Sequence, residues 1–520
     1  MKIVGIPLDI RPYNYDFLCS LARMDSRIAL KLPPKAILGL KKTPADHLAL
    51  NQFIDDEIAD ADALIMSLDM FIYGGLFPSR IHLTPLSELL TKIETLRAIK
   101  LKRPALKIYA SSLVLRTPAY NSSEEEPDYY RDCGEALFHY GYLTNKHQRL
   151  GLTQDELERL AVLRAQIGER NLEDWSKRRD KNRTVTRAAI QLVAEGVIER
   201  LVIPLDDTTE FGFTAMDQSL IYRWIAEYQV QDRTYVHPGT DETGCTLLTR
   251  AYLDQRKTPF IASTLCSSED FFQLIPNYED RPFKYSLNSH ASACGITLVA
   301  ECNHAPVLAI NGCGEKMQEA AEASYGYNVH TARKFTPYKN VTYYTRRNLV
   351  SFVNDIVQKS RTQPVVIADV AFSNGGETEL IELLDRSQAL DTLCGYAGWN
   401  TTCNTLGTAL ATLVFSSCGN NPQAVCAFLL ERLMSDWAYQ TEVRFKLQCE
   451  YLPQLNASYA RFAHVSAEVF AEMERQLYQT WRDHIKNAFN GCPPTLSRLS
   501  APFKRLSGIA IELAVNTGEG

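Results

Sequence analysis

The chain of 520 residues is long enough for two to four domains, or for one large α/β domain with an extension. It has 45% hydrophobic and 22% charged residues and a formal net charge of −6, which is ordinary for a globular protein. The mildly acidic balance and the lack of a long basic face exclude an obvious nucleic-acid-binding protein, and no apolar run reaches the ~20 residues that cross a bilayer.

The N-terminal residues lead directly into a strand-like apolar run, so the sequence predicts no signal peptide. The thirteen cysteines contain no Cys-x-x-Cys pair, and several of them, such as Cys394, Cys418 and Cys426, have apolar neighbours in the sequence. This pattern predicts reduced core thiols in a cytoplasmic protein and argues against a disulfide framework or a zinc site.

Short apolar runs alternate with longer helical patterns along most of the chain. Strands are predicted at 2–8, 63–68, 107–113, 200–205, 233–237, 259–264, 306–310, 364–370 and 392–396. Most of these runs are apolar on both faces, which is typical of parallel strands covered by helices on both sides. Helices are predicted at 88–100, 153–169, 183–199, 421–435 and 466–490, and a last strand at 506–515.

Strand–helix alternation over roughly 400 residues predicts a β/α barrel or a doubly wound sheet. No Gly-x-Gly-x-x-Gly follows the first strand and no Walker loop occurs, which disfavours a nucleotide-binding domain. We therefore expect the α/β class, with a (β/α) barrel-like parallel sheet in a catalytic domain at 1–415. A helical insertion is expected at about 119–182, and a mostly helical C-terminal extension with the closing strand at 416–520.

Polar side chains follow nearly every predicted strand. The carboxyl ends of parallel strands lie at one edge of a sheet, where ligand sites are built, so we expect these side chains to converge. The residues expected to bind the substrate are Asp9, Arg11, Asn14, Asp69, Tyr73, Arg80, Arg116, His237, Asp241, Glu242, Asp369, Trp399, Asn400 and Asn404. Taken singly, some of these residues have an alternative role in the fold instead of in substrate binding. An Asp after a strand often caps the next helix, and the glycine pairs at 74–75 and 375–376 are typical of backbone turns.

The apolar run 201–205 ends in two adjacent acids, Asp206 and Asp207. Neighbouring strand side chains point in different directions, and two acids near one substrate should have their pKa values pushed apart. One acid can then remain protonated while the other stays ionised, which is the division of labour that glycoside hydrolysis needs. We expect Asp207, nearer the loop, to be the general acid, and Asp206 to orient the substrate.

The resulting expectation is a carbohydrate-active hydrolase acting on a small-molecule or oligosaccharide substrate. Tyr13, Tyr73 and Trp399 are expected to stack on a sugar ring, while the asparagines and arginines at the strand ends bind its hydroxyls. Neither a metal nor a cofactor is expected to take part, and neither nucleic acid nor a membrane is an expected partner. Association into a homo-oligomer stays open.

Two other functions also stay open. A divalent ion bound by His237, Asp241, Asp206 and Asp9 would indicate a metal-dependent hydrolase or isomerase, although the cluster holds a single His and no His-x-His motif. A non-catalytic sugar-binding protein would need aromatic and arginine side chains but no paired acids.

Six stretches of this sequence resemble a bacterial family catalogued as domain of unknown function 4127. They are 7–14 (PLDIRPYN), 67–70 (SLDM) with 73–80 (YGGLFPSR), 205–208 (LDDT), 237–242 (HPGTDE), 397–400 (AGWN) and the closing segment 503–513. The sequence departs from the family pattern at Leu205, where a polar residue is expected. The family name implies no activity.

A second resemblance is carried by the dipeptide Asp206-Asp207 alone. It is similar to the paired aspartates of the barrel β-N-acetylglucosaminidases that remove O-linked sugar from proteins. That resemblance implies that one Asp orients the substrate's acetamido group, which is the internal nucleophile, and that the other is the general acid. N-acetylhexosaminides are the substrates it implies.

Overall fold

The computed structural model of this protein describes residues 1–329 and 331–514. Its chain forms two compact units, each of which contains one main parallel sheet with helices. The first unit comprises residues 1–10, 28–251 and 278–281. The second comprises residues 11–27, 252–277 and 282–520. The expected α/β class is confirmed.

The sheet of the first unit has six parallel strands in the order β2-β1-β3-β4-β5-β6. Its strands are β1 (Lys2–Ile6), β2 (Ala29–Lys31), β3 (Ala63–Ser67), β4 (Lys107–Ser111), β5 (Arg200–Leu205) and β6 (Thr234–Pro238). The five strands predicted between residues 2 and 237 are confirmed, because their apolar runs are buried. The sequence does not predict β2, whose three residues are partly exposed.

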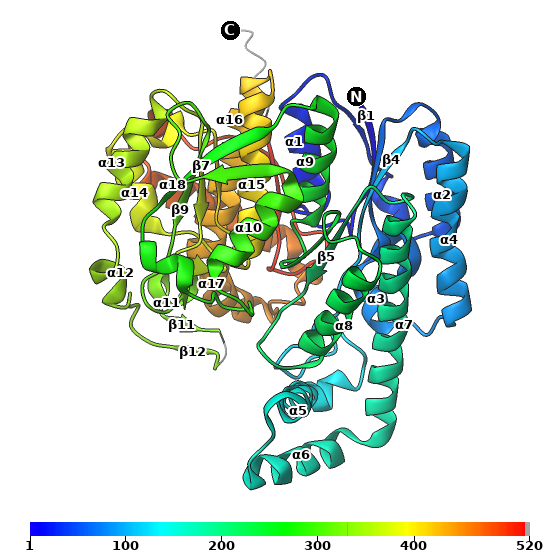
Figure 1. The fold of residues 1–520 in the computed structure, drawn as a ribbon. Coiled ribbons are helices and arrows are strands. Elements are labelled where there is room, and N and C mark those ends of the chain that lie inside the picture. Colours follow the sequence, from blue (N-terminus) through cyan, green and yellow to red (C-terminus); the bar gives the residue numbers. More distant parts are fainter. Residues whose placement is uncertain (330, 515–520) are drawn as a thin grey trace. The chain divides into compact units, whose positions relative to one another are not determined.

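Helices follow the strands from β2 to β6. They are α2 (His47–Glu57), α3 (Leu76–Ile81), α4 (Leu86–Lys102), α5 (Tyr130–Leu150), α6 (Gln154–Ile167), α7 (Glu169–Ala194), α8 (Phe213–Glu227) and α9 (Thr243–Arg256), with short turns at Lys35–Ile37, Ile58–Asp60 and Asp69–Tyr73. Helices α4, α7 and α8 pack side by side. The expected helical insertion contains α5, α6 and the first half of α7, and Figure 1 shows α5 and α6 together at the end of α7. Tyr130, Leu137 and Trp175 form the core there.

The sheet of the second unit has five parallel strands in the order β15-β13-β9-β7-β8. They are β7 (Phe260–Cys266), β8 (Ile296–Val299), β9 (Val307–Asn311), β13 (Val365–Asp369) and β15 (Gly395–Ala397). Four of them are predicted strands, and β8 is additional. Short pairs join β10 (Gln318–Glu319) to β14 (Phe372–Ser373), β11 (Tyr327–Asn328) to β12 (Arg333–Lys334), and β16 (Leu496–Ser500) to β17 (Ala510–Leu513).

The second unit has helices on both faces of its sheet and others beyond it. They are α1 (Asp16–Arg23), α10 (Phe283–Cys294), α11 (Ala320–Ser324), α12 (Thr342–Thr345), α13 (Leu349–Ser360), α14 (Thr378–Arg386), α15 (Thr402–Cys418), α16 (Pro422–Arg432), α17 (Arg444–Lys446) and α18 (Ser466–His484), with single turns or π-helical segments at Glu269–Gln273, Leu390–Thr392, Leu433–Val443, Leu447–Tyr451, Leu452–Leu455, Ala463–Val465 and Ala488–Gly491. Val365 and Ile367 of β13 share a core with α13, α14 and α18. Val366 lies on the other face with α15, whose Thr412 is nearby, and α15 packs against α10.

The two sheets have the same topology. If the strands of each sheet are counted in chain order, their order across the sheet is 2-1-3-4-5 in both, and the first sheet has a sixth strand beyond the fifth. Among the described residues no pairing joins the outer strands of either sheet, so the parallel strands form two open, doubly wound sheets where the sequence analysis favoured one barrel-like sheet. Barrels and doubly wound sheets share the same alternation of strands and helices, which is why the pattern alone does not separate them.

Residues 416–514, together with α15, pack within the second unit and are mostly helical, as expected. The predicted last strand at 506–515 is found as β17, while residue 515 lies outside the described residues. The expected domain boundaries at 1–415 and 416–520 stay a prediction.

None of the helices described here is long and apolar enough to cross a membrane. The thirteen cysteines, all within the described residues, are thiols. Cys426 is exposed on α16, so the expectation of a core position is wrong for this residue. Its place on the outward face of the helix explains the difference.

Candidate active site

The carboxyl-terminal edge of the first sheet carries most of the acidic residues expected in the site. Asp9 follows β1, Asp69 follows β3, the pair Asp206 and Asp207 follows β5, and Asp241 follows β6. Because these strands are parallel members of one sheet, all five aspartates lie at the same edge.

The two adjacent acids have different partners. Asp206 Oδ2 accepts a hydrogen bond from Arg80 Nη2 at 2.6 Å, whereas Asp207 Oδ2 accepts one from Arg116 Nη1 at 3.2 Å. The Asp206 side chain is 13% exposed and that of Asp207 is 30% exposed. The two acids therefore contact different arginines, and Asp207 is the more accessible acid.

Two glutamates, Glu125 and Glu126, hold the arginines in place. Arg80 Nη1 donates to Glu125 at 2.8 Å and to Glu126 at 3.2 Å. Arg116 donates to the same carboxylates at 2.7 Å and 2.9 Å. Sequence reasoning treated the acidic stretch before α5 only as part of an insertion and so missed both residues. Its run of three glutamates, 124–126, was the available signal.

Asp207 has an unusual backbone conformation, with φ at 43°. Asp is one of the few residues with a side chain that adopt this left-handed region with some frequency. Helix α8 begins at Phe213 with Gly212 as its N-cap, so Asp207 is not a helix cap. The capping alternative for Asp207 is therefore wrong, and the stretch 206–212 forms a loop between β5 and α8.

The protein environment raises the pKa of Asp207 to about 6. Desolvation is the main cause, the negative charge of Asp206 adds to it, and Arg116 opposes it. A carboxylic acid with this pKa is partly protonated near neutral pH, which suits a general acid.

Asp69, at the same edge of the sheet, is 3% exposed. Its Oδ2 accepts a hydrogen bond from the Leu113 backbone N–H at 3.0 Å. Burial raises the pKa of Asp69 to about 7, and the charge of Asp206 contributes. After Asp69 the chain makes a π-helical turn that ends at Gly74.

The glycine pair after this turn is required by the backbone. Gly74 and Gly75 have φ angles of 89° and 132°, and a Cβ on Gly74 would lie 2.7 Å from the Ala45 backbone nitrogen. These glycines thus form a tight turn between Asp69 and the helix that carries Arg80, as the structural alternative proposed. Tyr73 is 7% exposed, and its ring packs 4.7 Å from that of His82.

We expect Asp69→Asn to change how stability depends on pH. The folded-state pKa of Asp69 is about 7 against an ordinary 3.8, so the unfolded chain releases its proton first and the wild-type free energy of unfolding falls between about pH 4 and pH 7. The variant lacks this fall and should gain up to about 4 kcal/mol relative to wild type across that window. Urea unfolding at pH 4, 6 and 8 measures it, and parallel curves for both proteins would contradict the prediction.

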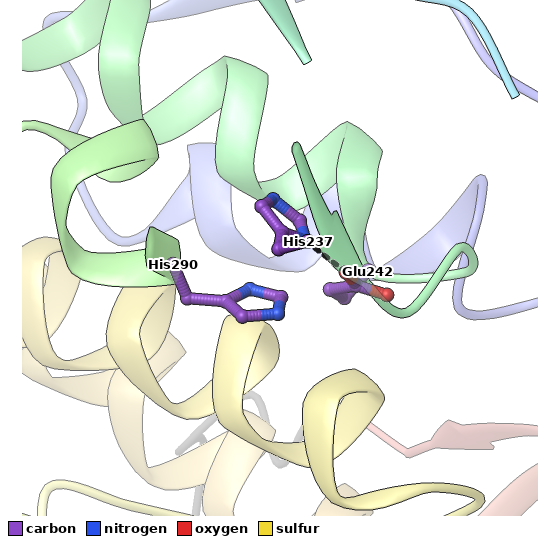
Figure 2. A group of neighbouring side chains, drawn as sticks. All are labelled: His237, Glu242 and His290. Carbon is purple, nitrogen blue, oxygen red and sulfur yellow. Dashed lines mark ion pairs between the residues drawn. The ribbon is translucent and has the colours of Figure 1, made fainter. Parts of the chain in front are cut away.

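A buried histidine, His237, lies in β6, and a buried glutamate, Glu242, follows this strand in the same unit. His237 Nδ1 lies 3.9 Å from Glu242 Oε1, and Figure 2 shows this pair as a dashed line. The Nδ1 atom is also 3.0 Å from the Pro238 carbonyl oxygen. Burial lowers the pKa of His237 to about 4, whereas burial and then the charges of Asp241 and Glu279 raise the pKa of Glu242 well above its usual range. His237 is therefore neutral near pH 7, and its surroundings favour the protonated form of Glu242.

The metal-ion alternative loses one of its expected ligands here. Asp206 is bound to Arg80 at 2.6 Å, and a guanidinium at that carboxylate competes with a cation. The other expected ligands, His237, Asp241 and Asp9, stay a prediction. The structure adds Glu242 beside His237 as a further oxygen donor in the first unit. His290, also labelled in Figure 2, lies on α10 and belongs to the second unit.

Asp369 lies at the end of β13 in the second unit, within a buried network. Its carboxylate accepts hydrogen bonds from the Tyr396 hydroxyl at 2.7 Å, from Asn311 at 2.9 Å and from the Glu377 backbone N–H at 2.7 Å. Glu377, the N-cap of α14, is in turn ion-paired with Arg347. Asp369 thus satisfies a backbone donor at the start of a helix, which is the structural alternative stated for it.

The family model described as "Protein of unknown function (DUF4127)" matches residues 3–512. The chain belongs to the DUF4127 family. The match covers nearly the whole chain, including both units and every candidate residue. Searches of curated proteins and of solved structures each found no match. The resemblance to this family is thus confirmed, and none of the comparisons supports the resemblance to glucosaminidases.

Trp399 of this DUF4127 protein is buried in the second unit with 4% exposure. Its ring stacks on Tyr13 at a centroid distance of 4.6 Å, and its indole N–H donates to Thr408 at 3.3 Å. Tyr13 in turn accepts a hydrogen bond from Arg11 at 2.9 Å. One face of the indole is therefore covered by the protein itself, and stacking on a sugar stays a prediction for both aromatic residues.

The three expected asparagines also belong to the second unit of the DUF4127 chain. Asn404 donates from Nδ2 to the Thr401 hydroxyl at 2.9 Å near the start of α15. Asn400 has a φ of 54° and accepts a hydrogen bond at its carbonyl from the Asn374 backbone. Asn14 is 2% exposed. The contacts at Asn400 and Asn404 shape turns and helix ends, and substrate binding by all three stays a prediction.

Proposed function

We propose that the first unit of this DUF4127 protein catalyses hydrolysis of a glycosidic bond. The observation that carries the proposal is the difference between the two adjacent acids. Asp206 is held by Arg80 at 2.6 Å, whereas Asp207 is more exposed, is contacted by Arg116 at 3.2 Å and has a pKa raised to about 6. A carboxylate held by an arginine beside an acid with a raised pKa is an arrangement that suits glycoside hydrolysis.

In this mechanism Asp207 donates its proton to the oxygen of the leaving group as the glycosidic bond breaks. Asp206, held by Arg80, stabilises the positive charge that develops at the anomeric carbon, or orients an acetamido group where the sugar carries one. Water then adds to the anomeric carbon, and its proton returns to Asp207. Arg80 and Arg116 fix the two carboxylates directly and are themselves held by Glu125 and Glu126, so little rearrangement is needed during the reaction.

A metal-dependent hydrolase is the second candidate, supported by the buried pair His237 and Glu242. The Nδ1–H of His237 can donate to the Pro238 carbonyl, which would make Nε2 the ligand atom, as is common in metal sites. The third function, sugar binding without catalysis, needs no pair of acids in different environments. We propose a cytoplasmic location, in keeping with the cysteines being thiols.

Release of p-nitrophenol from a panel of p-nitrophenyl glycosides, including the N-acetylglucosaminide, tests the proposal. We expect hydrolysis that EDTA does not inhibit. On an alkyl glycoside of the same sugar, whose leaving group must be protonated, kcat/KM should fall about tenfold per pH unit above pH 6. Activity that EDTA abolishes and Zn²⁺ restores would instead favour the metal-dependent candidate. A rate on the alkyl glycoside that is independent of pH between 5 and 8 would contradict the role of Asp207.

A further inference from the structure

The second unit contains a cavity of about 790 Å³ beside the end of β7. Ser267, Ser268, Glu269 and Asp270 line it from the loop after that strand, and residues 343–350 line it from α12 and the start of α13. Its volume lies within the range of about 300–1,000 Å³ that is usual for small-molecule sites.

The cavity lies where the strand order of the second sheet reverses. The chain leaves β7 through α10 toward β8, and leaves β9 through α13 toward β13 on the other side. In open parallel sheets, ligands bind in the crevice at the carboxyl ends of the two strands where connections diverge in this way. The loops after β7 and β9 meet there, since the Gly312 N–H donates to the Ser267 hydroxyl at 2.9 Å.

Charges around the cavity largely balance each other. Arg346 lies 3.4 Å from Asp270, Glu379 is ion-paired with Lys339, and the buried Arg347 is ion-paired with Glu377 behind the wall. Glu269 adds one more carboxylate to the lining. An anionic ligand such as a phosphate would meet these acids, so the lining favours a neutral ligand.

The remaining lining combines polar groups with aromatic rings. Tyr343 is fixed in the wall, because its ring stacks on Phe372 and its hydroxyl donates to the Ala371 carbonyl at 2.8 Å. Tyr344 is 58% exposed and lines the cavity. Tyr344 thus places an exposed aromatic ring beside carboxylates, a guanidinium and hydroxyls. This combination matches a sugar, whose ring has an apolar face and a rim of hydroxyls.

We propose that this cavity binds a neutral oligosaccharide. Tyr344 packs against the apolar face of one sugar ring, Asp270 and Glu269 accept hydrogen bonds from its hydroxyls, and Arg346 donates to them. The site lies in the second unit and uses none of the residues that we assign to the reaction, so it adds a sugar-binding function beyond the hydrolysis proposed for the first unit.

Isothermal titration of the full chain with cellotriose, chitotriose, maltotriose and xylotriose tests this site. The titrations use the Asp207→Asn background, so that hydrolysis does not consume the sugar. We expect one trisaccharide to bind, Tyr344→Ala to weaken it at least tenfold, and Asp270→Ala to weaken it severalfold. Tyr285→Ala is the matched control, because Tyr285 is similarly exposed at 53%, lies in the same unit on α10 and does not line the cavity.

Failure of all four trisaccharides to bind would overturn the proposal, as would equal affinity in the Tyr344→Ala and Tyr285→Ala proteins. Thermal unfolding of each variant confirms that a lost affinity is not lost folding. The two proposals can fail separately. If a trisaccharide binds through Tyr344 but no glycoside is hydrolysed, only the function proposed for the first unit is refuted. If glycosides are hydrolysed but no trisaccharide binds through Tyr344, only the sugar site of the second unit is refuted.

Discussion

Asp207→Asn is expected to lower kcat/KM by about 10²–10⁴-fold on a glycoside with a poor leaving group, because Asn cannot donate an acidic proton. Asn also tolerates the left-handed conformation that Asp207 adopts at φ 43°, so the loop should keep its shape. On a p-nitrophenyl glycoside the loss should be much smaller, since that leaving group needs little protonation. Steady-state rates on alkyl and aryl glycosides of the same sugar measure the contrast.

Asp206→Asn is the companion variant, and it should impair both substrates to a similar degree. Its carboxylate is assigned to charge stabilisation and orientation, which matter whatever the leaving group. The two variants change adjacent residues by the same single atom, so a general disturbance of the loop would affect them alike. Near-wild-type rates for both on a true substrate would show that these acids belong to the fold and not to the reaction.

Arg80→Met is expected to destabilise the protein by about 3–5 kcal/mol, because it leaves the carboxylates of Asp206, Glu125 and Glu126 without this guanidinium in a buried place. The Arg80 side chain is only 3% exposed, so water cannot replace it easily. Arg80 also lowers the pKa of Asp207, so the pH above which kcat/KM falls should move upward in the variant. Urea unfolding and a pH–rate profile measure the two effects.

Arg475→Met is the matched control for that substitution. Arg475 is 64% exposed and pairs with Glu472 at 2.7 Å on the surface of α18, so its removal should cost less than about 1 kcal/mol. Equal losses of stability in the two variants would mean that the ion pairs of Arg80 contribute no more to the free energy of unfolding than an exposed ion pair does. The conclusion that Arg80 holds Asp206 rigidly would then be wrong.

Much of the secondary structure of this protein is evident from its sequence. The nine predicted main strands are all found, because runs such as 200–205 are apolar on both faces and that local pattern already reflects burial on both sides of a sheet. The polar residues after β1, β3, β5 and β6 were also located correctly at strand ends. Parallel strands run in one direction, so their carboxyl ends lie at the same edge of the sheet whatever the order of the strands.

Other features depend on pairings between distant parts of the chain. Helices and strands alternate equally in a barrel and in two doubly wound sheets, so only the strand pairing decides between them. Arg80 and Asp206 are 126 positions apart, and their contact exists because β3, β4 and β5 are adjacent in one sheet. The apolar pattern specifies that each strand is buried but does not specify its neighbours.

The sequence by itself therefore determined the family, the α/β class and the two acids at the end of β5. The tertiary structure decided which residues surround those acids, including Glu125 and Glu126, and placed Trp399 in a core. It also decided the difference between Asp206 and Asp207, because a pKa depends on the desolvation and the charges that only the folded chain brings to a carboxylate.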